Sequence, residues 1–233
     1  MRVPALISFI LLCCLASGCW KGVTTQVAAT VLSVHGPVVF GADKQTDFQP
    51  ITPQSRLPGG SSVRTLNGAW LNLALLPGAL LQLSSNSEIK IEELKISKDG
   101  NETGDAMRSR TGRVRLNWGK ITILFSRSDK SASQVAISAR QATITADSDS
   151  LFCVQSDHAT TRLTCVQGKV YASQSAQPAV TIGDGYFQKW PSARLETIAA
   201  TEDAAAQIDV ADSLEIGDQL HELQSGRQNR RPF

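Results

Sequence analysis

Strict alternation of apolar and polar residues is the feature that most constrains how this chain folds. In the stretch 70–76, leucine occupies positions 71, 73 and 75, and in the stretch 113–118 the apolar side chains are Val114, Leu116 and Trp118. A period of two places one kind of side chain on each face of a strand. Turn signals such as Pro77-Gly78 and Asn86-Ser87 separate many short stretches of this kind. The sequence therefore predicts an all-β fold, either a β-sandwich or a β-roll.

The character of the chain changes after Trp190-Pro191. Residues 199–224 are rich in Ala, Asp, Glu and Gln, and the apolar residues fall near helical spacing at Ile208, Ala211, Leu214, Ile216, Leu220 and Leu223. We expect a short helical C-terminal segment of one or two helices, interrupted near Gly217. Residues 226–233 form a basic tail that we expect to be disordered.

The first twenty residues look like an export signal. Arg2 precedes a nearly unbroken apolar run over residues 5–15, which is too short to span a bilayer. The following Ala16-Ser17-Gly18-Cys19 resembles the lipobox of bacterial lipoproteins. This resemblance implies cleavage before Cys19 and a lipid (diacylglyceryl, with palmitate-type acyl chains) on its thiol. The alternative is an ordinary secretory signal. Trp20 is not aspartate, which resembles the class sorted to the outer membrane, so we expect a lipid-anchored envelope protein facing the periplasm.

These signals divide the chain into five parts. They are a signal peptide over residues 1–18, a lipid-anchored linker over 19–29, a β domain over 30–190, a helical segment over 191–225 and a tail over 226–233. Without Arg2 the chain has 22 Lys plus Arg against 21 Asp plus Glu, and this near-neutral balance argues against a nucleic-acid partner. No later stretch reaches 18 consecutive apolar residues, so no further membrane span is expected.

Two cysteines remain beyond the linker. Cys153 and Cys165 flank the stretch Asp157-His158-Ala159, and a symmetric turn centred on Ala159 would place them directly opposite each other. Opposite positions on antiparallel strands can approach to the distance that a disulfide needs. We predict a Cys153–Cys165 disulfide, with two reduced, half-buried thiols as the alternative.

A succession of glycine turns and strand stretches runs through the β domain. Its parts are Gly60-Ser61-Ser62-Val63-Arg64-Thr65, Asn67-Gly68, Pro77-Gly78, Asn86-Ser87-Glu88-Ile89, Gly119-Lys120-Ile121, Thr164-Cys165-Val166-Gln167-Gly168-Lys169-Val170 and Gly183-Asp184-Gly185. The succession resembles the FecR domain family over residues 30–190, with Asp149-Ser150-Leu151-Phe152 departing from the usual Gly-Thr-x-Phe. The resemblance implies an extracytoplasmic domain without a catalytic residue. The family's named member regulates iron uptake through an anti-sigma segment, a membrane helix and a periplasmic sensory portion, and this chain resembles only the last.

No familiar catalytic pattern accompanies these motifs. His35, His158 and His221 share no ligand spacing, and Glu88 and Glu92 are expected to lie on a solvated strand face rather than to act as an acid pair. We therefore expect no enzymatic activity, no cofactor and no metal.

One basic cluster is a candidate binding surface for an anion or a partner: Arg108, Arg110, Arg113, Arg115 and Lys120. Arg113 and Arg115 should share one face of a strand, and guanidinium groups suit phosphate and carboxylate. The alternative is a solvated face paired with acidic residues of the next strand.

The sequence thus predicts a lipid-anchored envelope protein without enzymatic activity that binds an unidentified envelope protein or glycan as a scaffold or sensor. The alternative is an extracytoplasmic component of a FecR-type signalling system that regulates transcription or iron uptake.

Overall fold

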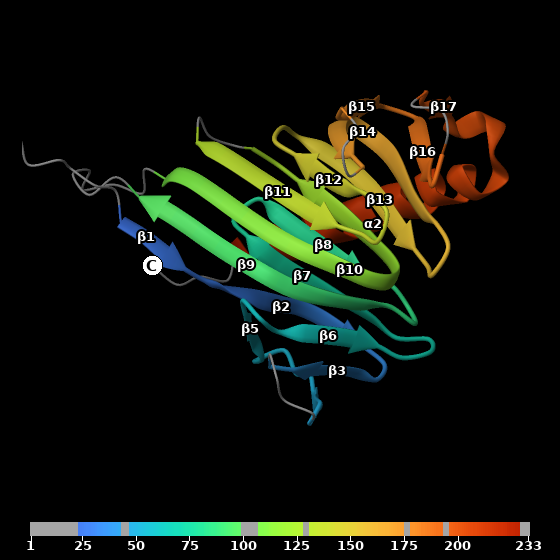
Figure 1. Cartoon of the computed structure of the whole chain (residues 1–233). Coiled ribbons are helices and arrows are strands. Elements are labelled where there is room, and N and C mark those ends of the chain that lie inside the picture. Colours follow the sequence, from blue (N-terminus) through green and yellow to red (C-terminus); the bar gives the residue numbers. More distant parts are fainter. Residues whose placement is uncertain are drawn as a thin grey trace, which may run out of the picture.

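The computed structural model describes residues 23–42, 47–98, 107–127, 131–174, 178–192 and 196–228. These residues are mostly β-strand and end in one long helix, so the predicted all-β class with a C-terminal helical segment is confirmed (Figure 1). Strands begin at Val23 and continue to Ala199, beyond both limits of the expected β domain. No helix in these ranges is both long enough and apolar enough to cross a membrane.

The strands form two sheets around one apolar core. The first, here called the open sheet, contains in spatial order β4 (Gln49–Pro50), β3 (Val38–Gly41), β6 (Ser62–Thr65), β9 (Glu88–Lys98), the first part of β10 (Met107–Phe125), β11 (Ala132–Ser138), β12 (Thr143–Ala146), the last part of β14 (Thr161–Ser173) and β15 (Val180–Gly183). β1 (Val23–Gln26) pairs with the end of β9. Neighbours are antiparallel except β10 and β11.

The second sheet, here called the covered sheet, lies behind the open sheet in Figure 1. Its strands, in spatial order, are β5 (Arg56–Pro58), β2 (Ala28–His35), β7 (Trp70–Leu76), β8 (Ala79–Leu83), the last part of β10, β13 (Ser150–Ser156), the first part of β14, β16 (Tyr186–Trp190) and β17 (Ile198–Ala199). Leucines of β7 and isoleucines of β9 belong to the same buried cluster, so the two sheets share one core.

Two glycines allow single strands to take part in both sheets. Gly119 has φ +94° at the point where β10 leaves the open sheet, and a Cβ there would lie 2.1 Å from Ser87 Oγ. Gly168 has φ +78° at the equivalent point of β14, and a Cβ there would lie 2.0 Å from the Asp149 carbonyl oxygen. Only glycine combines a positive φ with so close an approach of another segment. These two bends fold the ladder of strands around the core.

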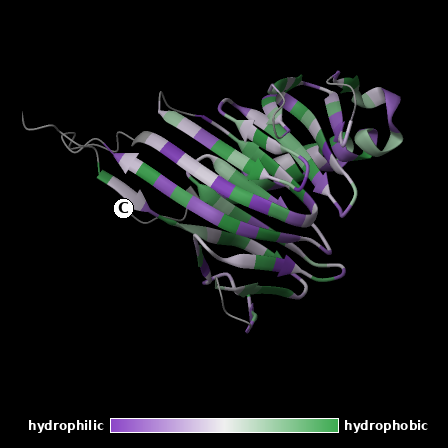
Figure 2. Ribbon diagram, viewed as in Figure 1, coloured by the Kyte–Doolittle hydropathy of each residue, from purple (hydrophilic) through white to green (hydrophobic). Residues whose placement is uncertain are grey.

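The open sheet has the alternation that the sequence predicts. Val114 and Leu116 of β10 are buried, whereas Arg113 and Arg115 between them are exposed. Figure 2 shows the same alternation of hydrophilic and hydrophobic residues along the neighbouring strands of this sheet. One face of the open sheet therefore packs on the core and the other faces water.

The middle strands of the covered sheet are buried on both faces because a helix lies across their outer side. This helix, α2 (Ala204–Gln228), follows the short 3-10 turn η1 (Ala200–Glu202) and packs on β8, β10, β13 and β14. The side chain of Asp203 caps it by accepting a hydrogen bond of 2.8 Å from the Ala206 amide. The double burial explains why every residue of β8 is buried.

The helix differs from the sequence expectation in extent and in orientation. It continues through Gly217 because this glycine faces the sheet, where a Cβ would lie only 3.0 Å from Leu151 Cδ2. Ile208 and Leu214 are 59% and 41% exposed, although their spacing suggested a buried stripe. Asp209 and Ser213 are buried instead. The helix thus packs through small and polar residues over much of its length.

Candidate functional site: a groove between helix and sheet

The outer face of the covered sheet carries a row of uncharged side chains beneath α2. Cross-strand pairing links six consecutive positions on six neighbouring strands, namely Ser33, Asn72, Gln82, Thr122, Cys153 and Thr164. Side chains at directly paired positions point to the same face of a sheet. Five of the six are buried, and Ser33 is half-buried. A polar surface, rather than an apolar one, therefore receives this part of the helix.

An ion-pair cluster fixes the first half of α2 to this row. The Asp209 carboxylate accepts a hydrogen bond of 2.7 Å from Arg162 Nε and lies 2.9 Å from Lys120 Nζ. It also accepts a hydrogen bond of 3.3 Å from Thr164 Oγ1. Lys120 reaches Asp212 at 2.9 Å as well. A buried carboxylate needs such partners, because burial without them is costly.

The same cluster shifts two pKa values. Burial alone would favour the neutral amine of Lys120. In the alkaline range where Lys120 loses its proton, Cys153 also ionises, and the attraction of its thiolate, together with Asp209 and Asp212, outweighs burial and raises the pKa of Lys120 to about 12. Burial, followed by repulsion from Asp209, raises the pKa of the Cys153 thiol to about 12. Cys153 is therefore a neutral and unreactive thiol at physiological pH.

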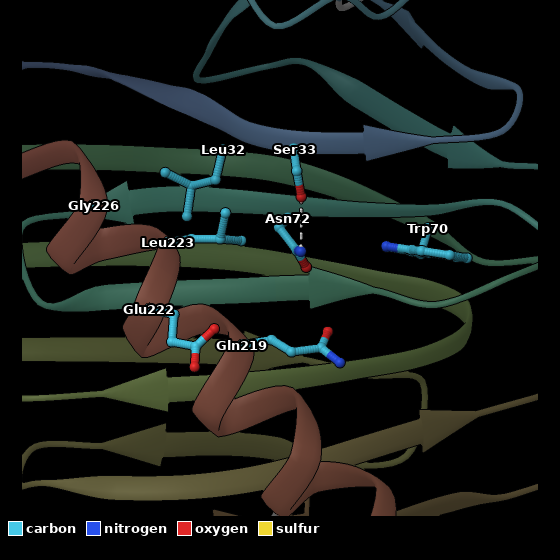
Figure 3. A pocket seen from close by; sticks show the side chains of 8 residues that line it. All are labelled: Leu32, Ser33, Trp70, Asn72, Gln219, Glu222, Leu223 and Gly226. Atoms are coloured by element: carbon cyan, nitrogen blue, oxygen red, sulfur yellow. Dashed lines mark hydrogen bonds between the residues drawn. The ribbon is translucent and has the colours of Figure 1, made fainter. Parts of the chain in front are cut away.

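The second half of α2 stands away from β2 and β7 and leaves a groove of about 640 Å³ between helix and sheet (Figure 3). Its sheet side is lined by Leu32, Ser33, Trp70 and Asn72, and its helix side by Gln219, Glu222, Leu223 and Gly226. This volume lies within the range of about 300–1,000 Å³ that is typical of small-molecule sites. Among the described residues of the lining, Glu222 is the only charged one.

Two sheet residues give this groove its chemical character. The Trp70 ring stacks on His35 with centroids 3.7 Å apart and an interplanar angle of 14°, yet Trp70 stays 39% exposed. Asn72, on the same strand, is only 2% exposed and donates a hydrogen bond of 2.9 Å from Nδ2 to Ser33 Oγ. Its Oδ1 is buried without a hydrogen-bond partner among the described residues. The groove thus combines an aromatic surface with a buried acceptor.

The basic cluster expected from the sequence is divided among three environments. Arg113 and Arg115 lie together on the outer face of the open sheet, as predicted, and pair with Glu93 at 3.4 Å and Glu92 at 2.6 Å. Lys120 belongs to the helix cluster described above. The side chain of Arg108 lies outside the described residues.

Arg110 is not part of this exposed face. Its guanidinium is buried and donates hydrogen bonds to the Ser133 and Ser131 hydroxyl groups and to the Pro77 carbonyl oxygen. It therefore holds loops together rather than presenting a charge to a partner. The alternation could have shown this, because Arg110 has the same parity as the buried Val114 and Leu116 and therefore lies on the opposite face from Arg113 and Arg115.

The expected disulfide is wrong, because Cys153 and Cys165 are both free thiols. Cys153 pairs with Thr164, and Cys165 pairs with Phe152, so the cysteines point to opposite faces of the sheet. The loop has four residues, and the Asp157 carboxylate accepts hydrogen bonds from the Ala159 and Thr160 amides. The turn is therefore centred between His158 and Ala159, and the register differs by one residue from the predicted one. Cys165 joins the core between the sheets.

The histidines and the acidic residues do not form a reactive cluster. His35 stacks on Trp70, while His158 and His221 are exposed at a hairpin tip and on the helix. Glu88 accepts hydrogen bonds from Arg64 and Asn117, and Glu92 pairs with Arg115. In the ranges that the structure describes, no three His, Cys, Asp or Glu residues are placed to hold a metal ion. Cys19, the predicted lipidation site, lies outside these ranges.

Sequence reasoning missed the groove and the helix cluster. Asn72 carried little signal, because an amide between Leu71 and Leu73 is ordinary on a strand face that was expected to be solvated. Asp209 carried none, since an acidic residue on a surface helix is ordinarily exposed. Its burial depends on Arg162 and Lys120, which are distant in the sequence.

These features define a two-sheet β protein whose second sheet is covered by a helix. Residues 61–171, which include β6 to most of β14, match the family described as FecR protein, the family that the sequence was predicted to resemble. The match covers just under half of the chain and ends before α2.

The solved structures that resemble this chain include two crystal structures of a proposed anti-sigma factor from Parabacteroides distasonis ATCC 8503, at 1.65 and 2.50 Å resolution. Each has a TM-score of 0.42, with 13% and 14% sequence identity. The similar region covers 59% of this chain and 57% of those chains. No curated protein matches the chain.

Proposed function

We propose that the chain is the extracytoplasmic component of a FecR-type signalling system, and that it binds a protein partner rather than catalysing a reaction. The observation that carries this proposal is the FecR match over residues 61–171. The named member of that family is a regulator of iron uptake, and the matched region of this chain includes the strands that join both sheets. The proposal favours signalling over a purely structural role in the envelope.

The proposal includes a lipid anchor at Cys19, which would hold the chain at the outer membrane facing the periplasm. Its support is the apolar run followed by Ala16-Ser17-Gly18-Cys19. Stable anchoring requires two acyl chains or a second membrane signal, which a lipoprotein anchor supplies. Labelled fatty acid should be incorporated by the wild-type chain and not by Cys19→Ser. Equal incorporation by both would contradict the anchor without touching the signalling proposal.

The signalling proposal is tested by capturing the partner in intact cells. A photo-crosslinking amino acid is placed at Leu214 on the outer face of α2, and separately at Gln134 on the exposed face of the open sheet. The expected result is a specific crosslink from one of these positions to a membrane-embedded regulator. A crosslink only to a porin, a transporter or a glycan would contradict signalling and support the scaffold alternative, and so would the absence of any specific crosslink.

A further inference from the structure

The groove between α2 and the strands β2 and β7 has the chemistry of a ligand site. The described residues of its lining combine apolar side chains with hydroxyl, amide and carboxylate groups, and none of these residues is a lysine or an arginine. Sites for small ligands commonly have an apolar lining and a few polar groups that fix the orientation of the ligand. The single charge, on Glu222, repels anions. The lining therefore favours a neutral ligand over a phosphate or a carboxylate.

Trp70 provides a flat surface at one end of this groove. Its ring is held by the stack with His35, and much of it remains open to solvent. The face of an aromatic ring carries negative potential and attracts the positively polarised hydrogens of a partner. The C–H groups on one face of a sugar ring have this character, and their flat arrangement matches an indole. An aromatic side chain fixed before binding also loses little entropy when a ligand stacks on it.

Asn72 provides an acceptor that has no donor. Its Nδ2 is used by Ser33, while Oδ1 has no hydrogen-bond partner in the described parts of the chain. A buried acceptor left unpaired costs about 1–3 kcal/mol, so native proteins seldom keep one without a reason. Figure 3 shows Asn72 between Trp70 and the helix residues Gln219 and Leu223. Oδ1 is itself covered, so a ligand reaches it only when a neighbouring side chain moves aside.

We propose that this groove binds a neutral saccharide, with one sugar ring stacked on Trp70 and a hydroxyl or acetamido N–H donating a hydrogen bond to Asn72 Oδ1. Glu222 and Gln219 on the helix accept and donate hydrogen bonds to further hydroxyl groups of the same ligand. A saccharide satisfies the three requirements of the groove together, because it offers an apolar ring face, many donors and no charge. The ligand would touch both α2 and the sheet.

The site goes beyond the proposed function and does not depend on it. Partner capture uses positions 214 and 134, which lie outside the groove lining. A chain that binds sugar but captures no regulator would contradict only the signalling proposal. A chain that captures a regulator but binds no sugar would contradict only the saccharide site.

The test uses purified protein and two neutral probes, a trimer of N-acetylglucosamine and a trimer of glucose, in titration calorimetry and saturation-transfer NMR. We expect at least one trimer to bind the wild type. Binding of only the acetylated trimer would identify the acetamido N–H as the donor, and binding of both would identify a hydroxyl group. Absence of binding by both trimers at millimolar concentration would overturn the proposal. Binding of a peptide in the groove, when neither trimer binds, would also overturn it.

Three variants localise the binding. Trp70→Ala and Asn72→Leu should each weaken affinity about tenfold or more, since 1.4 kcal/mol corresponds to a factor of ten. Tyr186→Ala is the matched control, because Tyr186 is an exposed aromatic residue of the same sheet outside the groove lining. Its affinity should stay within about twofold of the wild type, well below the tenfold that 1.4 kcal/mol represents. Equal binding by Trp70→Ala and the wild type would refute the site. This variant also decides the question if Asn72→Leu fails to fold.

The charge of the groove gives an independent readout. A trimer of galacturonic acid should bind the wild type more weakly than the glucose trimer at low salt, because Glu222 repels its carboxylates. Glu222→Gln should reduce this difference. Preferential binding of the anionic trimer by the wild type would contradict the proposal of a neutral ligand.

Discussion

Asp209 of α2 and Arg162 of β14 form a hydrogen-bonded ion pair of 2.7 Å across the helix–sheet interface. The Asp209 side chain is 3% exposed, and Lys120 of β10 approaches the same carboxylate. The helix turns Ile208 and Leu214 towards solvent at this level. Its first half is therefore held to the sheet by charge and hydrogen bonds rather than by an apolar stripe.

Asp209→Ala should weaken this attachment strongly. The substitution leaves Arg162 without its carboxylate partner on a covered face, and breaking a buried ion pair costs about 3 kcal/mol. Asp212→Ala is the control, since Asp212 is half exposed and its pair with Lys120 is worth less than about 1 kcal/mol. Urea unfolding of both variants measures the difference. Equal losses would show that the Asp209 cluster does not anchor the helix.

The two free thiols report separately on the helix and on the core. Cys153 lies beneath α2 and Cys165 lies between the sheets, and both are fully buried. We expect slow modification of both by N-ethylmaleimide in the native protein. Asp209→Ala should accelerate modification of Cys153 by up to about 100-fold, because about 3 kcal/mol less free energy is then needed to open the helix.

Modification of Cys165 should change much less, because exposing it requires separation of the two sheets. Mass spectrometry of the peptides that contain each cysteine distinguishes the two rates. If both thiols accelerate equally, the variant opens by global unfolding and the helix does not move as a separate unit.

The hairpin of β13 and β14 shows where sequence reasoning succeeds and where it fails. Composition and alternation are sufficient to predict both strands, because each has to bury one face. The pairing register depends on whether the loop has an odd or an even number of residues, and here the Asp157 carboxylate stabilises a four-residue loop. An error of one residue exchanges the faces of a strand, so the predicted disulfide failed although its strands were correct.

The groove could not be predicted for a different reason. Its walls are residues 32–33, 70–72 and 219–226, which only the tertiary arrangement of α2 brings together. Arg113 and Arg115 were placed correctly on one exposed face because that placement follows from the local period of two. Arg110 was misplaced because it was grouped with its neighbours in the sequence, although the same period of two puts it on the face of the buried Val114 and Leu116. Only its partners, such as Pro77 and Ser131, could not be found from the local pattern.

The raised pKa values predict a loss of stability at alkaline pH. Burial raises the pKa of Cys153 from 9.0 to about 12, and burial similarly raises the pKa of Cys165 to about 12. Between these values the unfolded chain has lost the thiol proton and the folded chain still holds it. The unfolded state then binds fewer protons, so the free energy of unfolding falls as pH rises, by up to about 1.4 kcal/mol per unit for each thiol.

This decrease should begin near pH 9 and be measurable as a falling urea midpoint. Cys153→Ala should remove the part of the pH dependence of the unfolding free energy that comes from the Cys153 thiol. At pH 7 the stability should change only by the packing cost of the substitution. Lys120 contributes in the same direction at higher pH, because its pKa is also raised. A slope unchanged by Cys153→Ala would contradict the assignment of the titration to this thiol.

Arg113 and Arg115 remain the candidate surface for an anionic envelope component, and Arg110 offers an internal comparison. The first two are 60% and 58% exposed, so replacing both by glutamine should lower stability by no more than about 1 kcal/mol. Arg110→Gln should cost about 3 kcal/mol, because it leaves buried hydroxyl and carbonyl groups without their charged donor.

Capture of envelope components by the double variant should weaken, and wild-type capture should decrease with salt as screening shortens to about 8 Å at physiological ionic strength. Melting curves recorded beside the capture assay separate the two effects. Unchanged capture with unchanged stability would reduce Arg113 and Arg115 to ordinary ion pairs with Glu93 and Glu92. A large loss of stability in the double variant would show that these ion pairs are structural.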